Sequence, residues 1–172
     1  MRDEELARSR EVGGLTHRVL ATLAQHTQRP SPDEIKRAIS AAMPGYAPIE
    51  ARAHRQNIAS GVFAYFRFLL PPTPWSFLGA EVALGPGRVD LMWQEAGGQV
   101  LLDEIKTGSS RQLALTRTLD QITSYLDCAR SEFGDSLVGL RLLSTTDPRR
   151  SLFIHPGGEH QPLFATPYGK AA

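Results

Sequence analysis

Three charged residues at the ends of two short strands are the best candidates for chemistry. They are Asp90, Glu104 and Lys106, within the segment RVDLMWQEAGGQVLLDEIKTG at 88–108. The pair Gly97-Gly98 predicts a tight hairpin between the two strands, because glycine adopts the positive φ that such turns need. The hairpin brings an aspartate of the first strand close to a glutamate and a lysine of the second.

Strand periodicity decides which acidic residue of the second strand accompanies the lysine. Successive side chains of a strand point to opposite faces, so Glu104 and Lys106 share one face. Asp103 is the competing carboxylate, but it falls on the other face with the apolar Leu101 and Ile105. The alternation therefore favours Glu104 over Asp103 as the partner of Lys106.

Charges at the end of an apolar strand need a compensating partner. A carboxylate and an ammonium group without partners are costly to bury. A divalent cation held by Asp90 and Glu104 offsets that cost, and oxygen ligands suit Mg²⁺ or Mn²⁺. Lys106 then lies beside the metal, where it can orient a water or stabilise a phosphate. This is the chemistry of phosphodiester hydrolysis.

These residues carry a family resemblance. Asp90 followed by Glu104-Ile105-Lys106 resembles the D…(D/E)xK signature of the PD-(D/E)XK nuclease superfamily. The longer strings 87–90 (GRVD) and 104–108 (EIKTG) are similar to the "GRxD" and "(D/E)xKTG" motifs of its RecB-type branch. The resemblance implies an α/β fold with a restriction-endonuclease-like core, in which helices flank a mixed central β-sheet. It also implies a deoxyribonuclease that depends on Mg²⁺ or Mn²⁺, with the backbone carbonyl of Ile105 as a further metal ligand.

A histidine near the N-terminus extends the resemblance. The helical pattern alone predicts that His17 is buried on a helix face of small apolar residues and is hydrogen-bonded to the backbone. However, the segment 14–17 (GLTH) resembles the "GxxH" motif that opens RecB-type domains, where the histidine binds metal. The resemblance thus implies that His17 is a ligand together with Asp90 and Glu104.

Three more residues are assigned to the site by the same resemblance. Gln121 and Tyr125 lie one helical turn apart and match the "QxxxY" motif, which helps to position the catalytic lysine or the nucleic-acid strand. Glu81 precedes the "GRxD" strand as a glutamate often does in this branch. We therefore expect Gln121 and Tyr125 among the catalytic residues and Glu81 beside the site, where it binds metal indirectly, touches nucleic acid or caps an edge.

Periodicity and turn residues predict the elements that must position these groups. One domain is expected over 1–172, with a mainly helical part at 1–72, a core of sheet and helix at 73–155 and an irregular tail at 156–172. The expected helices cover 3–27, a segment from Ser31 to Met43, 50–69 and a stretch after Ser110. The expected strands, besides the hairpin, are 75–84, 137–144 and 151–155.

The composition is ordinary and excludes few classes. The 172 residues are 41% hydrophobic and 22% charged, with a net charge of +1 and a pI of about 8.0. This charge neither supports nor excludes nucleic acid, because basic residues can gather on one face. The single Cys128 excludes an internal disulfide and a multi-cysteine metal site. We expect no membrane association and a cytoplasmic location.

Several alternatives remain open from the sequence. The partner is expected to be DNA, single- or double-stranded, with RNA as a possible alternative substrate. The absence of a helicase segment suggests either a stand-alone nuclease or a subunit that receives DNA from a helicase or other protein in repair, phage defence or a mobile element. The rival from another class is a non-catalytic subunit that binds nucleic acid or acts as a scaffold. Basic residues at Arg52, Arg55, Arg149 and Arg150 either contact phosphate or are simply solvated.

Overall fold

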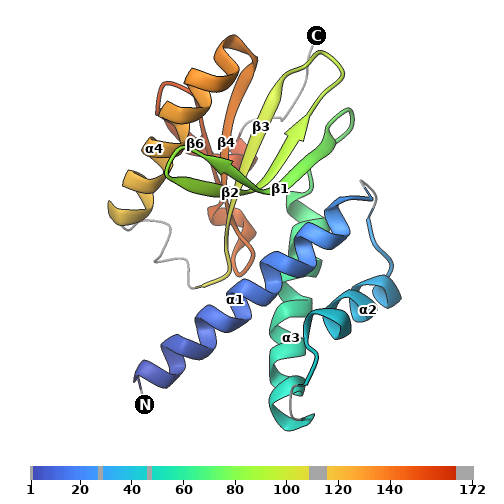
Figure 1. Cartoon of the computed structure of the whole chain (residues 1–172). Coiled ribbons are helices and arrows are strands. Elements are labelled where there is room, and N and C mark those ends of the chain that lie inside the picture. Colours follow the sequence, from blue (N-terminus) through green and yellow to red (C-terminus); the bar gives the residue numbers. More distant parts are fainter. Residues whose placement is uncertain (1, 27–28, 46–47, 109–115, 166–172) are drawn as a thin grey trace.

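The chain begins with a helical half. The structure is a computed structural model and describes residues 2–26, 29–45, 48–108 and 116–165 (Figure 1). The helices are α1 (Arg2–Ala24), α2 (Pro32–Ala42), α3 (Pro48–Ala64), the π-helical turn η1 (Tyr65–Leu69) and α4 (Thr116–Phe133). The start of α2 follows from the sequence, because Ser31 and Glu34 form a capping box in which each side chain bonds to the other's backbone N–H.

A six-stranded sheet follows, with its strands side by side in chain order. The strands are β1 (Ser76–Leu84), β2 (Gly87–Gln94), β3 (Val100–Lys106), β4 (Leu137–Ser144), β5 (Leu152–Ile154) and β6 (His160–Pro162). The pair β3–β4 is parallel and the other neighbours are antiparallel. Because parallel neighbours need a crossover, α4 connects β3 to β4. The expected α/β fold with a mixed central sheet is confirmed.

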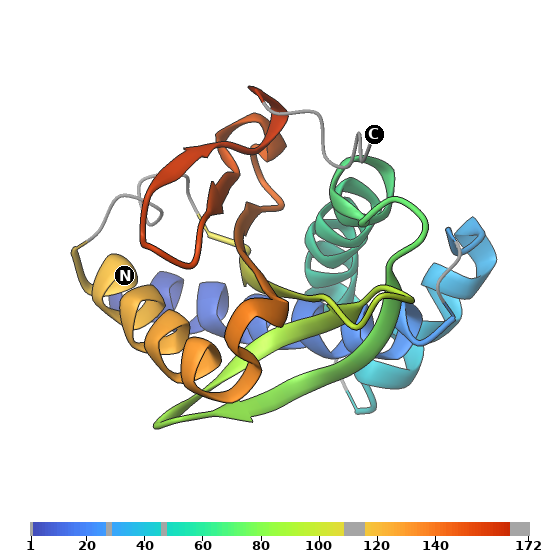
Figure 2. The ribbon, with the colours of Figure 1, turned by 90° about the horizontal axis from the view of Figure 1, so that it is seen from above.

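The two faces of the sheet carry separate apolar cores. One core joins the sheet to the N-terminal helices and includes Leu20, Tyr65 and Trp93. The other joins the sheet to α4 and includes Leu102 and Leu126. The N-terminal helices and α4 therefore cover opposite faces (Figures 1 and 2). Among the described residues, no helix combines the length and the apolar character needed to span a membrane.

The predicted hairpin is present between β2 and β3. Gly98 has φ of +84° and donates its N–H to the Glu95 carbonyl at 2.9 Å, which closes the turn. Predicted helices and strands agree with the observed elements to within a few residues. The exception is the end of the predicted helix 50–69, where the last five residues form the π-helical turn η1.

The prediction of an irregular tail over 156–172 is wrong for its first part. Residues 160–162 form β6, which pairs with β5 through a tight turn where Gly158 has φ of +96°. Leu163 follows and is buried, so it anchors this hairpin against the core. The short β6 thereby covers an edge of β5 that would otherwise be open. Residues 166–172 lie outside the described part of the chain, and the single-domain boundary of 1–172 remains a prediction.

Candidate active site

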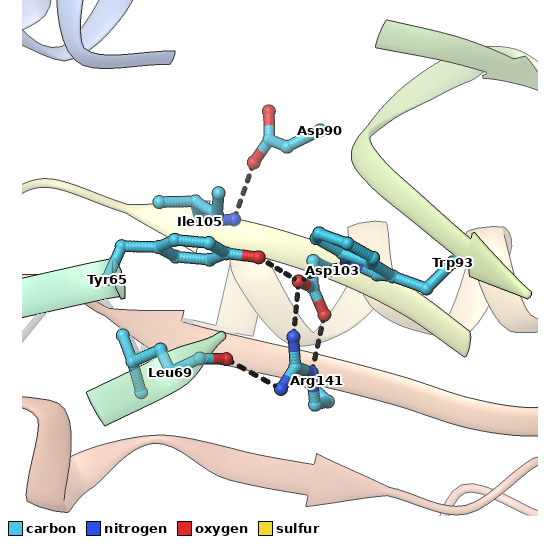
Figure 3. Close-up of polar contacts among 7 residues, drawn as sticks. All are labelled: Tyr65, Leu69, Asp90, Trp93, Asp103, Ile105 and Arg141. Atoms are coloured by element: carbon cyan, nitrogen blue, oxygen red, sulfur yellow. Dashed lines mark hydrogen bonds and ion pairs between the residues drawn. The ribbon is translucent and has the colours of Figure 1, made fainter. Parts of the chain in front are cut away.

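The central hairpin opens at the level of the candidate residues. The pairing of β2 with β3 extends as far as Leu91 and Asp103. Beyond this pair, the Ile105 N–H donates to Asp90 Oδ2 at 2.5 Å, so a side-chain carboxylate replaces the backbone acceptor of a neighbouring strand (Figure 3). Since the N–H and C=O of one strand residue face the same edge, the Ile105 carbonyl also points toward this opening. The separation of the two strands thus leaves the Ile105 N–H and carbonyl directed toward Asp90.

Three side chains from different elements meet beside this opening. The Nδ1 atom of His17, on α1, lies 2.9 Å from Asp90 Oδ1. Glu81, on β1, lies opposite Asp90 in the register set by Ala80–Leu91 and Val82–Val89. One ligand atom from each of His17, Glu81 and Asp90 falls within 4.8 Å of the others, close enough to share one ion. A nitrogen and two carboxylates form a suitable donor set for Mn²⁺ or Mg²⁺.

Glu81 reaches this cluster through an unusual backbone conformation. Its φ is +51°, in the left-handed region that side chains other than glycine seldom adopt. A β-bulge between Phe77 and Gly79 precedes it in the same strand. Bulges redirect side chains at strand edges, and strained residues gather at functional sites. The backbone therefore supports Glu81 as a member of the site.

Glu104 and Lys106 lie together next to this cluster, as the alternation predicted. Lys106 Nζ donates to Glu104 Oε1 at 2.7 Å. The other oxygen, Glu104 Oε2, is buried and has no hydrogen-bond partner among the described residues. A buried carboxylate oxygen without a donor is costly, and a bound cation would satisfy it. This orphaned atom suits a position beside a divalent metal.

Burial and crowding of charge shift two pKa values in the site. Burial raises the pKa of Glu104 to about 7, the charge of Asp90 adds to this rise, and Lys106 opposes it. For His17, burial lowers the pKa, but the hydrogen bond to Asp90 and the charges of Asp90, Glu104 and Glu81 outweigh it and raise the pKa. A bound cation would relieve the mutual repulsion of the three carboxylates, Glu81, Asp90 and Glu104.

Asp103 lies on the other face of β3 and has a structural role. Its side chain is fully buried and accepts hydrogen bonds from Arg141 on β4, Tyr65 on η1 and Trp93 on β2 (Figure 3). The Arg141 guanidinium binds both carboxylate oxygens, at 2.6 and 2.5 Å, and also donates to the Leu69 carbonyl at 2.8 Å. The strands β2, β3 and β4 and the turn η1 are thus tied together one residue before Glu104.

The predicted pair on α4 lies close to the start of β2. Gln121 Nε2 donates to the Tyr125 hydroxyl at 2.6 Å, and Tyr125 is buried. A Cβ placed on Gly87 would come within 2.5 Å of the Tyr125 ring, so glycine is needed here for the ring to pack. Within the described part of the chain, neither side chain bonds to Lys106. Their expected role in positioning the lysine or the nucleic acid remains a prediction.

The sequence did not predict the full roles of Glu81 and Arg141. Glu81 was expected beside the site, whereas the structure places it within the three-residue cluster and leaves Glu104 just outside that cluster. The signal was available: Glu81 and Asp90 are equidistant from the turn at Gly85-Pro86, so a hairpin pairs them. The role of Arg141 was also missed, although an arginine within the apolar strand LVGLRLLS requires a buried carboxylate partner.

This geometry defines the class of site: three carboxylates, an imidazole and a lysine gathered at the open end of a central hairpin. The PD-(D/E)XK nuclease superfamily matches residues 1–162, nearly the whole chain. The chain therefore belongs to the PD-(D/E)XK nuclease superfamily. Its restriction-endonuclease-like core agrees with the expected fold, whereas the RecB-type subdivision remains a prediction.

Two solved structures are similar over part of the chain. The EndoMS–dsDNA2 complex is 26% identical, with a TM-score of 0.32, over 42% of this chain and 28% of that chain. A repair endonuclease from Pyrococcus abyssi is 20% identical, with a TM-score of 0.38, over 60% of this chain and 40% of that chain. The chain thus spans less than half the length of either protein. No curated protein matches it.

Proposed function

We propose that this chain is a deoxyribonuclease that uses Mg²⁺ or Mn²⁺ to hydrolyse phosphodiester bonds. The observation that carries the proposal is the cluster of His17, Glu81 and Asp90 beside the orphaned oxygen of Glu104. Membership of a nuclease superfamily supports the reaction class. DNA as the substrate, the cytoplasm as the location, and a role in repair, defence or a mobile element are parts of the same proposal.

The metal would be held by His17, Asp90, Glu104 and the Ile105 carbonyl, to which we add Glu81. When bound, such an ion lowers the pKa of a coordinated water and neutralises charge on the scissile phosphate. Asp90 is oriented by the Ile105 N–H, and His17 is oriented by Asp90. The metal-binding groups are thus held in position before an ion arrives.

Lys106 supplies the positive charge that the metal ligands lack. Its ammonium group is held by Glu104 at 2.7 Å and remains partly exposed, so it can reach a phosphate at the mouth of the site. There it would stabilise negative charge that develops on the phosphate or orient the attacking water. Gln121 and Tyr125 would position the strand that is cut.

The decisive experiment compares Lys106→Ala with an exposed lysine variant. Lys36→Ala is a matched control, because Lys36 lies on α2 with an exposed side chain. We expect Lys106→Ala to bind nucleic acid normally and to cut plasmid or oligonucleotide DNA at least about 100-fold more slowly with Mn²⁺. Wild-type cutting rates in Lys106→Ala would reject the assigned role of this lysine.

The rival is a non-catalytic subunit that binds nucleic acid or serves as a scaffold with a nuclease-like fold. In that case the folded chain would bind no Mn²⁺ by calorimetry and would show no nicking of plasmid or single strands. The buried carboxylates favour the metal-binding proposal, since an idle site would keep their unfavourable burial with no compensating gain. Competition between RNA and DNA substrates would separate a ribonuclease from a deoxyribonuclease. Pull-down with a helicase or other protein would test for a partner that delivers DNA.

A further inference from the structure

The outward face of α3 and η1 carries exposed aromatic rings around an arginine. The Phe63 and Phe68 side chains are 52% and 51% exposed, although phenyl rings of this size are usually buried. The Arg67 guanidinium carbon lies 5.7 Å from the Phe63 ring centre and 5.2 Å from the Phe68 ring centre. Each distance is within the range of a cation–π contact. The two rings and the guanidinium therefore form one surface.

Two more arginines extend this surface along the helix. Arg52 on α3 lies on the same side of the helix as Phe63 on α3 and Arg67 on η1, three and four helical turns away, and Arg55 lies beside it. We call the five residues the α3 strip; they are Arg52, Arg55, Phe63, Arg67 and Phe68. All five are exposed. From Arg52 to Arg67 the strip is about 20 Å long.

The charge of the α3 strip is not neutralised. Among the residues whose side chains the structure describes, none of its three arginines forms an ion pair with a carboxylate. Arg29 adds a fourth positive charge, since its Nη2 donates to the Arg67 carbonyl at 3.3 Å. A net charge of +1 for the whole chain thus hides a locally basic surface. Such a surface attracts a polyanion.

The strip lies on the far side of α3 from the end of β3. A Cβ on Gly61 of α3 would be 3.3 Å from Thr145 Oγ1, and the Thr145 N–H donates to the Lys106 carbonyl at 3.1 Å. The small Gly61 thus allows α3 to pack against Thr145, the residue after β4, which is bonded to the last residue of β3. Phe63 is two residues further on, about 200° around the helix axis, so it faces away from the sheet. A helix is about 10 Å thick, which a flexible strand of a few nucleotides spans.

From these contacts we propose that the α3 strip binds a single-stranded segment of nucleic acid next to the site of cleavage. The arginines bind successive phosphates, and the Phe63 and Phe68 rings stack against bases. Unpaired bases expose their π-faces, whereas duplex bases are stacked on each other, so this chemistry selects single strands. The inference rests on the proposed function and adds the form of its substrate.

The chemistry of the strip favours nucleic acid over a protein partner. The two rings are separated by a guanidinium and do not form a continuous apolar patch of the kind that a helix or a second subunit would cover. Alternating positive charges and flat rings match a chain that alternates phosphates and bases. A protein that docks on the strip is instead an outcome of the test below.

The test measures binding in the absence of cleavage. A fluorescein-labelled 15-mer of thymidine and its duplex with adenosine are titrated with the full chain in EDTA, with fluorescence anisotropy as the readout. We expect tighter binding of the single strand, and an at least about 30-fold weaker Kd in the F63A/F68A double variant, from about 1–3 kcal/mol for each of two stacked bases. Phe164→Ala is the matched control, because Phe164 is 53% exposed outside the strip, and its Kd should equal that of wild type.

Salt dependence tests the arginines separately. Arg67→Ala should reduce the slope of log K against log salt by about 0.7, the value for one phosphate contact on a single strand. Arg130→Ala on α4 removes the same charge on the other face of the sheet and should leave the slope unchanged. Circular dichroism melts of all variants verify that they are folded.

Two results would overturn the inference. One is wild-type affinity for the single strand in F63A/F68A, which would assign the strip to a protein contact. The other is wild-type binding that is equal or stronger for the duplex. Failure here is distinguishable from failure of the proposed function, because Mn²⁺ binding and plasmid nicking depend on the carboxylate cluster and are measured independently.

Discussion

Replacing Glu104 by Gln should change how the stability of the metal-free protein depends on pH. In the folded protein, burial and the charge of Asp90 raise the pKa of Glu104 from 4.5 to about 7. Between these two pH values, the folded state keeps a proton that the unfolded state has released. The free energy of unfolding therefore falls as pH rises from about 4.5 to about 7, and the loss persists above pH 7.

The size of the effect follows from the two pKa values. At about 1.4 kcal/mol for each pH unit between them, ionisation of Glu104 costs about 3 kcal/mol at pH 8. The Glu104 side chain is 6% exposed, so solvent screening reduces this figure little. The raised pKa of His17 acts in the same direction, since its stabilisation is present below about pH 6.5 and is lost as pH rises through its folded pKa.

The assay is urea unfolding in EDTA at pH 5, 6, 7 and 8. Wild type should lose about 2.5 kcal/mol more than Glu104→Gln between pH 5 and pH 8, since glutamine cannot ionise and the contribution of His17 is largely shared. The test compares how the free energy of unfolding changes with pH in the two proteins. Any cost of packing a glutamine is the same at every pH, so it shifts the whole Glu104→Gln profile without changing its slope. Glu132→Gln, an exposed substitution on α4, is the control and should run parallel to wild type. Parallel profiles for wild type and Glu104→Gln would refute the reasoning.

Three further predictions concern the surroundings of the site. Arg141→Met should lower the free energy of unfolding by about 3–5 kcal/mol in guanidinium titrations, because it leaves the buried Asp103 carboxylate without its cation; a loss below 1 kcal/mol would show that the pair is not important for stability. Gly87→Ala should cost about 1–3 kcal/mol by thermal melts, because the new Cβ would lie 2.5 Å from the Tyr125 ring, and an unchanged melting temperature would contradict this contact. Asp90→Ala should abolish Mn²⁺ binding by calorimetry, since it removes the carboxylate between His17 and Ile105; unchanged affinity would remove Asp90 from the metal site.

The sequence by itself determined the local elements and the choice between neighbouring residues. Alternation along β3 separated Glu104 and Lys106 from Asp103, and the structure has these side chains on opposite faces. The Gly97-Gly98 turn and the helix start at Ser31 were likewise predictable, because turns and caps depend on residues a few positions apart. Such patterns are local, so a single sequence contains all the information that they need.

The tertiary structure decided which groups share the site. His17 meets Asp90 because α1 packs across the sheet, and Glu81 joins them because a bulge and a positive φ redirect β1. The bond from the Ile105 N–H to Asp90 exists because β2 and β3 separate beyond their last backbone pair. These contacts depend on how helices and strands dock through the shape of the two cores, and periodicity along the chain carries no information about that docking.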